Sequence, residues 1–155
     1  MNNINGYVHR KSGAMMIKNI TKESFQPYGT VIEFSANPED PRFEVVVTES
    51  NHPWRLAVLR VVEREFDKLE CHTMSLESFE PVSGTGLIIV AEHDKPDQFE
   101  VFLLDKSVCL NKGIWHQMIP LSLETIVKIS ENLEVSSDFH HLGKSYTFNI
   151  SGGNN

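Results

Sequence analysis

The feature that most limits the fold of this sequence is the lack of a helical apolar repeat in any window of fifteen residues. Apolar residues instead occur in short runs rich in β-branched side chains, and Gly, Pro and Asp separate these runs. This pattern is typical of a β-sandwich or a β-barrel. The chain is therefore predicted to be all-β, with sheets around an interior that side chains or one small ligand fill. The predicted strands cover residues 30–34, 43–48, 54–62, 67–74, 77–81, 86–92, 99–104, 114–119, 125–129 and 145–150.

Length and local signals predict one domain. At 155 residues the chain has the size of a single domain. Thr21 can cap one short helix over residues 22–26, which Pro27 then ends. Residues 1–15 are polar and aperiodic, so they are predicted to be a disordered extension. The folded domain is accordingly expected to cover residues 16–150.

Charge and cysteine content exclude several partners. Lys and Arg number 14 and Asp and Glu number 21, which gives a net charge of −7. Such a chain repels phosphate backbones and anionic lipid surfaces, so neither nucleic acid nor membrane is an expected partner. The expected partner is a small-molecule substrate. The longest apolar runs are too short to span a bilayer. Cys71 and Cys109 are too few for a disulfide scaffold, and we expect reduced thiols in a cytoplasmic protein.

Two of the seven histidines, His72 and His116, fall within predicted strands, whereas the others lie in the extension, in loops or in a polar late segment. Glu70 lies two residues before His72, so the two side chains share one face of a strand, and Cys71 is expected to pack on the other. Imidazole nitrogen with carboxylate oxygen suits Mn, Fe, Ni or Zn. Such an ion can stabilise an anion that develops on a substrate. A divalent metal is therefore a candidate cofactor.

The surroundings of these histidines resemble the two signature segments of the cupin superfamily. The first segment runs His-x-His, three or four residues, Glu, six residues, Gly, and the second centres on Gly-x-x-His. The matching residues are Glu70, His72, Glu77 and Gly84 in the first segment, and Gly113 and His116 in the second. The resemblance implies a cupin-like barrel of jelly-roll type, with His72, Glu77 and His116 as metal ligands.

A closer resemblance extends over residues 16–133. Four motifs in order resemble the ureidoglycolate lyase (ureidoglycolate hydrolase) family. They are the opening Phe25 with Tyr28-Gly29 and Val31-Ile32-Glu33; Leu69-Glu70-Cys71-His72 with Phe79-Glu80-Pro81; the turn Asp94-Lys95-Pro96-Asp97; and Gly113-Ile114-Trp115-His116 with Pro120. Family members split (S)-ureidoglycolate into glyoxylate and urea, in the breakdown of purine-derived allantoin. The resemblance also implies a homodimer.

Site roles can be assigned to five residues. His116, Glu70 and Lys112 are the candidate catalytic residues, and Arg60 and Trp115 are the candidate substrate-binding residues. Lys112 or Arg60 would hold the substrate's carboxylate, and Arg60 matches an arginine in the family's corresponding strand. An Arg60 side chain that faces the barrel interior suits this role, whereas one that faces outward would be solvated. A tryptophan such as Trp115 is otherwise a packing residue.

Five positions depart from the family pattern. Cys71 replaces an arginine, Glu77 replaces a glutamine, Asn111 and Lys112 replace His-Arg, and Gln117 replaces a histidine. These changes remove cationic and imidazole groups near the expected site, and fold does not fix function. Two alternatives therefore stay open: a cupin-like domain that binds a small metabolite without turnover, and another metal-dependent cupin enzyme.

Overall fold

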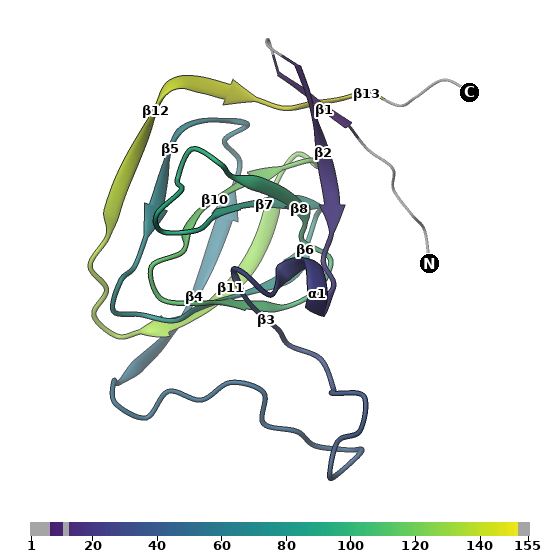
Figure 1. Cartoon of the computed structure of the whole chain (residues 1–155), viewed down its shortest axis with the longest axis vertical. Helices are drawn as coiled ribbons and strands as arrows, with labels where there is room; N and C mark the ends of the chain where they lie inside the picture. Colours follow the sequence, from purple (N-terminus) through teal and green to yellow (C-terminus); the bar gives the residue numbers. More distant parts are fainter. Residues whose placement is uncertain (1–6, 11–12, 152–155) are drawn as a thin grey trace.

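Two facing sheets and one short helix make up the chain (Figure 1), whose computed structural model describes residues 7–10 and 13–151. The elements are β1 (Tyr7–Arg10), β2 (Gly13–Asn19), α1 (Lys22–Phe25), β3 (Gly29–Val31), β4 (Trp54–Val61), β5 (Glu65–Cys71), β6 (Glu77–Ser83), β7 (Gly86–Ala91), β8 (Glu100–Leu103), β9 (Val108–Leu110), β10 (Trp115–Pro120), β11 (Thr125–Asn132), β12 (Asp138–Thr147) and β13 (Asn149–Ser151). One sheet has the order β12-β5-β10-β7-β8-β2-β1-β13 and the other β3-β9-β6-β11-β4. The predicted all-β class is thereby confirmed.

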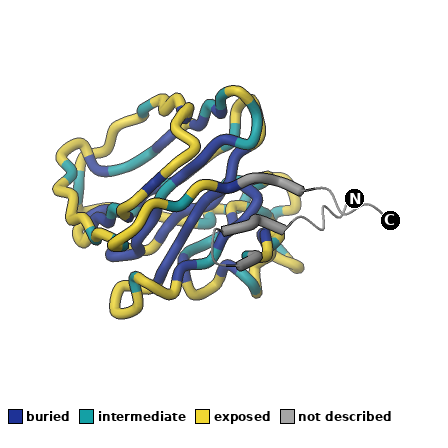
Figure 2. The backbone as a smooth tube through the Cα atoms, turned by 90° about the horizontal axis from the view of Figure 1, so that it is seen from above, coloured by how far each residue is buried: buried dark blue, intermediate teal, exposed yellow. Residues whose placement is uncertain are grey.

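The eight-stranded sheet is apolar on both faces at its centre, where β7 lies. Strand β7 is buried along its whole length. Its Ile88 and Val90 belong to the core cluster between the sheets, together with Phe79 of the facing sheet. Leu87 and Ile89 point the other way, into a second cluster on the far face. Figure 2 shows these buried segments in dark blue, with exposed connections in yellow around them. Alternation therefore supplies two apolar layers from one strand.

The short helix forms where its cap predicts. Thr21 has an extended backbone, and its hydroxyl accepts a hydrogen bond from the amide of Ser24 at 3.0 Å. The side chain of Ser24 in turn accepts from the amide of Thr21 at 2.9 Å. This reciprocal capping satisfies two amides that the first helical turn leaves without partners. The buried ring of Phe25 then fixes the helix to the core between the sheets.

Several predicted boundaries were wrong. Residues 43–48 were predicted to be a strand but lie in the connection 32–53, which contains no helix or strand. This β3–β4 connection extends away from the two sheets in Figure 1. A β-branched sequence alone does not make a strand, because a strand also needs a partner edge. Strand β9 was not predicted, and β12 places His140 and His141 in a strand rather than a loop.

The expected extension over residues 1–15 also contains strands. Strand β1 pairs with β2 and with β13, and β2 runs parallel to β8. Residues 1–6 and 11–12 lie outside the described residues. Backbone hydrogen bonds hold β1 in place, and these do not depend on an apolar pattern in the side chains. Polarity alone was therefore a poor guide to this segment.

The two cysteines are expected to resist alkylation in the native protein. Both are free and buried, and Cys71 lies in the second cluster, away from Glu70 as predicted. Burial raises the pKa of each thiol to about 11, so little thiolate is present at pH 8. Mass spectrometry after iodoacetamide treatment at pH 8 should show no label in native protein and two labels in unfolded, unreduced protein. A single label or an internal disulfide in the unfolded sample would contradict this.

Candidate active site

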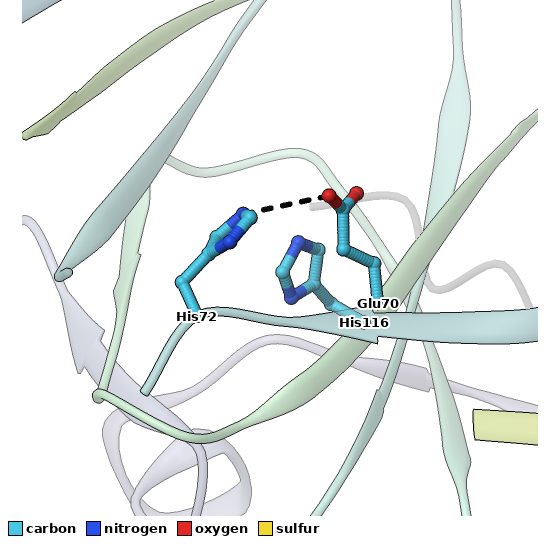
Figure 3. A group of neighbouring side chains, drawn as sticks. All are labelled: Glu70, His72 and His116. Carbon is cyan, nitrogen blue, oxygen red and sulfur yellow. Dashed lines mark ion pairs between the residues drawn. The ribbon is translucent and has the colours of Figure 1, made fainter. Parts of the chain in front are cut away.

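Both sheets contribute to a cluster of side chains at one end of the interior. Strand β10 carries His116, which lies directly opposite Glu70 of β5. His72 follows the last residue of β5, and Glu77 begins β6 in the facing sheet. Figure 3 shows the side chains of Glu70, His72 and His116 directed toward a shared space. The predicted shared face of Glu70 and His72 is thus confirmed, and His116 lies beside them.

One backbone contact aligns the two histidine segments. The amide of Gly113 donates a hydrogen bond to the carbonyl of His72 at 2.8 Å. Gly113 has a φ of +82°, a left-handed conformation that glycine adopts without the strain of a Cβ atom. The turn before β10 is thereby fixed to the turn after β5. This explains in physical terms why a Gly-x-x-His segment accompanies the first histidine.

Glu77 lies between the two imidazoles. Its Oε2 atom is 3.0 Å from Nε2 of His116 and 3.2 Å from Nε2 of His72. All three residues are buried, with 6–8% of their surface exposed. Glu70 is more distant, with its Oε1 atom 4.0 Å from Nε2 of His72. The buried part of the cluster therefore brings the Nε2 atoms of His72 and His116 together with Oε2 of Glu77.

The outer nitrogen of each ring is held by a backbone carbonyl. Nδ1 of His72 lies 3.0 Å from the carbonyl oxygen of Ser136, and Nδ1 of His116 lies 3.1 Å from that of Ile114. A carbonyl oxygen can only accept, so Nδ1–H is the donor in both contacts. In the neutral ring the lone pair is then on Nε2 and points into the cluster. This orientation is the one that a histidine metal ligand needs.

The charges in the cluster stabilise one another. Burial lowers the pKa of His72, but the Glu77 carboxylate outweighs burial and raises this pKa to about 9. The same two effects act on His116, whose pKa is also raised. Burial raises the pKa of Glu77, and the two imidazoles outweigh it and lower this pKa to about 2. At neutral pH the metal-free cluster thus contains a carboxylate beside imidazolium groups.

The donor set fits a divalent transition metal. Oε2 of Glu77 is buried and has no aligned hydrogen-bond donor among the described residues. This oxygen atom lies 3.0–3.2 Å from the Nε2 atoms of His116 and His72. Two ligand atoms that each lie about 2.1 Å from an ion, at right angles to each other, are about 3 Å apart. The observed distances are therefore close to those of metal ligands. Donor atoms of Glu70, His72 and His116 lie within 4.8 Å of one another. Two imidazoles and carboxylates suit Ni, Mn, Fe or Zn.

Comparison with known proteins identifies the family. The family model described as ureidoglycolate lyase matches residues 12–140. The chain belongs to the ureidoglycolate lyase family. A ureidoglycolate lyase of Agrobacterium fabrum is 29% identical over 126 residues, which is 68% of this chain and 76% of that protein. One of Rhizobium etli (strain CIAT 652) is 30% identical over 122 residues, covering 64% and 72% of the two chains.

Solved structures show more distant likenesses. An oxalate decarboxylase structure has a TM-score of 0.43 at 14% identity, and the match covers 72% of this chain but only 35% of that one. A dTDP sugar isomerase from Desulfovibrio desulfuricans G20 has a TM-score of 0.41 at 11% identity, over 92% and 80% of the two chains. In the described part of this family member, no helix is long and apolar enough to cross a membrane.

Of three further residues expected at the site of this lyase-family chain, two lie on faces that point away from it. Arg60 faces outward, with 67% of its side chain exposed, and its Nη1 atom lies 3.1 Å from Oε2 of Glu124. Lys112 contacts Glu49 of the β3–β4 connection, with Nζ 2.9 Å from Oε2. Trp115 packs in the second cluster, on the opposite face of β10 from His116. The predicted interior roles of Arg60 and Trp115 are therefore corrected.

Strand alternation accounts for both corrections. Val61, next to Arg60, belongs to the core between the sheets, so Arg60 must point away from it. His116 faces the interior, so its neighbour Trp115 faces the second cluster, where its indole N–H donates to the carbonyl of His93 at 3.0 Å. The same rule, applied to adjacent residues, could have found both placements from the sequence.

Two residues that the sequence analysis missed lie next to the cluster. Glu131 of β11 is directly opposite Glu77, and Arg55 of β4 is directly opposite Glu131. A carboxylate oxygen of Glu131 lies within 4.8 Å of donor atoms of both His72 and Glu77. Neither residue belongs to a motif, and their positions depend on strand register.

Proposed function

We propose that this chain cleaves ureidoglycolate to glyoxylate and urea at the cluster of His72, Glu77 and His116. The observation that carries the proposal is the meeting of both motif histidines with a buried carboxylate, in a member of the ureidoglycolate lyase family. The curated relatives bear the name of this activity. A buried cluster of opposite charges is a suitable environment for proton transfer.

The reaction needs one base and stabilisation of one oxygen. A base removes the proton of the substrate's hydroxyl group, the carbon–oxygen bond becomes a carbonyl, and the carbon–nitrogen electron pair leaves with urea, whose nitrogen takes up a proton. Glu70 is the proposed base, because it adjoins the cluster but is not enclosed within it. In the absence of a metal, protonated His116 is proposed to stabilise the developing oxyanion through its Nε2–H group. A divalent metal held by His72, Glu77 and His116 would replace that proton and supply the positive charge instead.

A coupled assay for urea release tests this proposal. Purified wild-type protein should release urea and glyoxylate from ureidoglycolate in equal amounts, and elemental analysis should find one of Ni, Mn, Fe or Zn. Absence of turnover together with tight binding of a small acid would instead support the second candidate, a cupin-like binding domain.

That candidate is favoured by one observation: Lys112 and Arg60, the cations expected at the site, contact Glu49 and Glu124 instead.

The proposed enzyme is a cytoplasmic homodimer, and an apolar surface on β4 and the β3–β4 connection suits a second copy. Its eight large apolar residues are 36–72% exposed: Ile32, Phe34, Phe43, Val45, Val47, Trp54, Leu56 and Val58. Large exposed apolar patches mark interaction surfaces, and one partner contributes roughly 800 Å² to a standard interface. Val47 and Trp54 line one pocket of about 350 Å³, so the two segments adjoin.

Leu56→Asp is expected to convert this dimer to a monomer, because burying a charge without a partner is costly. Size-exclusion chromatography with light scattering measures the mass. Leu123→Asp is the matched control, since Leu123 is 90% exposed in the turn between β10 and β11 and lies outside the apolar surface. A monomeric wild type, or a Leu56→Asp variant that remains dimeric, would overturn this assignment of the surface.

A further inference from the structure

A row of charged residues crosses the inner face of the five-stranded sheet and ends at the cluster. Arg55 of β4, Glu131 of β11 and Glu77 of β6 lie directly opposite one another in successive strands. Their face is the inner one, because Ile129 and Ala57, two residues from Glu131 and Arg55, pack in the core between the sheets. The register of three strands therefore brings a guanidinium to the same end of the interior as the histidine pair.

Glu131 holds Arg55 in one orientation. The Nε and Nη2 atoms of Arg55 lie 3.0 and 2.7 Å from the same Oε1 atom of Glu131. Only 8% of the Glu131 side chain is exposed, whereas 46% of the Arg55 side chain is. A guanidinium has five N–H donors, and this contact uses two of them. The remaining donors of a half-exposed, fixed guanidinium can bind a ligand.

An anionic substrate needs such a group here. Glu70, Glu77 and Glu131 place three carboxyl groups around the site, and the two imidazoles of the cluster offset at most two of these charges. The carboxylate of ureidoglycolate would therefore be repelled unless a further cation compensates. Lys112 and Arg60 form their ion pairs with other residues. The planar fork of a guanidinium matches a carboxylate and binds it through two parallel hydrogen bonds. Arg55 therefore has both the charge and the geometry for this task.

The distances suit the two-carbon glycolate part of ureidoglycolate. A carboxylate oxygen of Glu131 lies within 4.8 Å of donor atoms of His72 and Glu77, and the Arg55 guanidinium is 2.7 Å from Glu131. In ureidoglycolate the carboxylate is attached directly to the carbon that bears the hydroxyl group. One small molecule can thus place its hydroxyl group at the histidine pair and its carboxylate toward Arg55.

We infer that Arg55 binds the carboxylate of the substrate and that Glu131 is the residue that positions it. This inference rests on the proposed lyase function for the identity of the substrate. It also names a specificity determinant outside both histidine motifs, because the pair selects an acid over a neutral compound of the same size.

Binding of glyoxylate, measured by calorimetry, tests the inference without any turnover. Arg55→Gln should weaken glyoxylate binding by about tenfold or more, since it removes a charged hydrogen-bonding partner. Arg55→Lys should restore part of the affinity, because a lysine keeps the charge but not the fork. Glycolamide, a neutral analogue, should bind equally to all variants. Arg60→Gln is the matched control on the same strand and should behave as wild type.

The positioning role of Glu131 has its own readout. Glu131→Gln keeps the side-chain shape but weakens the contact with Arg55, so it should raise KM for ureidoglycolate more than it lowers kcat. Unchanged glyoxylate affinity in Arg55→Gln, equal weakening of glyoxylate and glycolamide, or no glyoxylate binding by wild type would each overturn the inference. Failure of wild type to release urea while glyoxylate binding still depends on Arg55 would instead overturn the lyase function alone.

Discussion

Replacement of His116 by alanine is expected to lower urea release from ureidoglycolate by at least about 10²-fold, the usual effect of losing one electrostatic or acid–base group. His116 Nε2 lies 3.0 Å from Glu77 Oε2, so the substitution removes one of the two imidazoles that compensate this buried carboxylate. The reaction builds negative charge on an oxygen atom, and a fixed donor stabilises such charge best where water is excluded. Steady-state rates from the coupled urea assay measure the effect.

The control for this variant is His141→Ala. His141 lies on β12, the neighbour of β5 in the same sheet, and its side chain is exposed. Circular dichroism should show matched folding for both variants, because most of the core around β10 is apolar and remains in place. Equal turnover by wild type and His116→Ala would remove His116 from the reaction while leaving the lyase class intact.

The sequence predicted the histidine side of the site well because that side depends on local rules. Glu70 and His72 share a face through the two-residue period of a strand, and the Gly113 turn positions His116 opposite them. These contacts lie within or next to the motif segments. Predicting the cluster therefore required only that the strands be assigned correctly and that the segments of His72 and His116 be neighbours.

The cation side of the site could not be predicted in the same way. Arg55 and Glu131 are 76 positions apart, and their contact depends on the register between β4 and β11, which no local pattern determines. Arg60 matches a family position, yet strand alternation turns its side chain outward. Residues 43–48 illustrate a related limit, because their strand-like composition has no partner edge among the described residues of this chain.

Glu77→Gln is expected to weaken the binding of a divalent metal strongly, because Glu77 is proposed to be a direct ligand. Loss of a residue that only contacts a ligand lowers metal affinity by roughly 10–100-fold, and the loss here should be larger. An amide keeps the shape of the side chain but removes the negative charge between His72 and His116. Zn²⁺ or Ni²⁺ affinity, measured by competition with a chelator, gives the size of the loss. Glu80→Gln is the matched control on the same strand, since Glu80 is exposed and contacts Lys128 instead.

The pH dependence of metal affinity separates loss of a ligand from general damage. In wild type the pKa of His72 is raised to about 9, so protons compete with the metal below that pH, and affinity should rise with pH until about 9. Without the Glu77 charge, burial lowers the pKa of His72 and only the Ser136 carbonyl and the Glu70 carboxylate oppose it, so this pKa falls below its wild-type value. The affinity of Glu77→Gln should therefore reach its plateau at a lower pH than that of wild type. The same plateau pH in both proteins would show that Glu77 does not control the protonation of His72, and equal affinity would show that Glu77 is not a ligand.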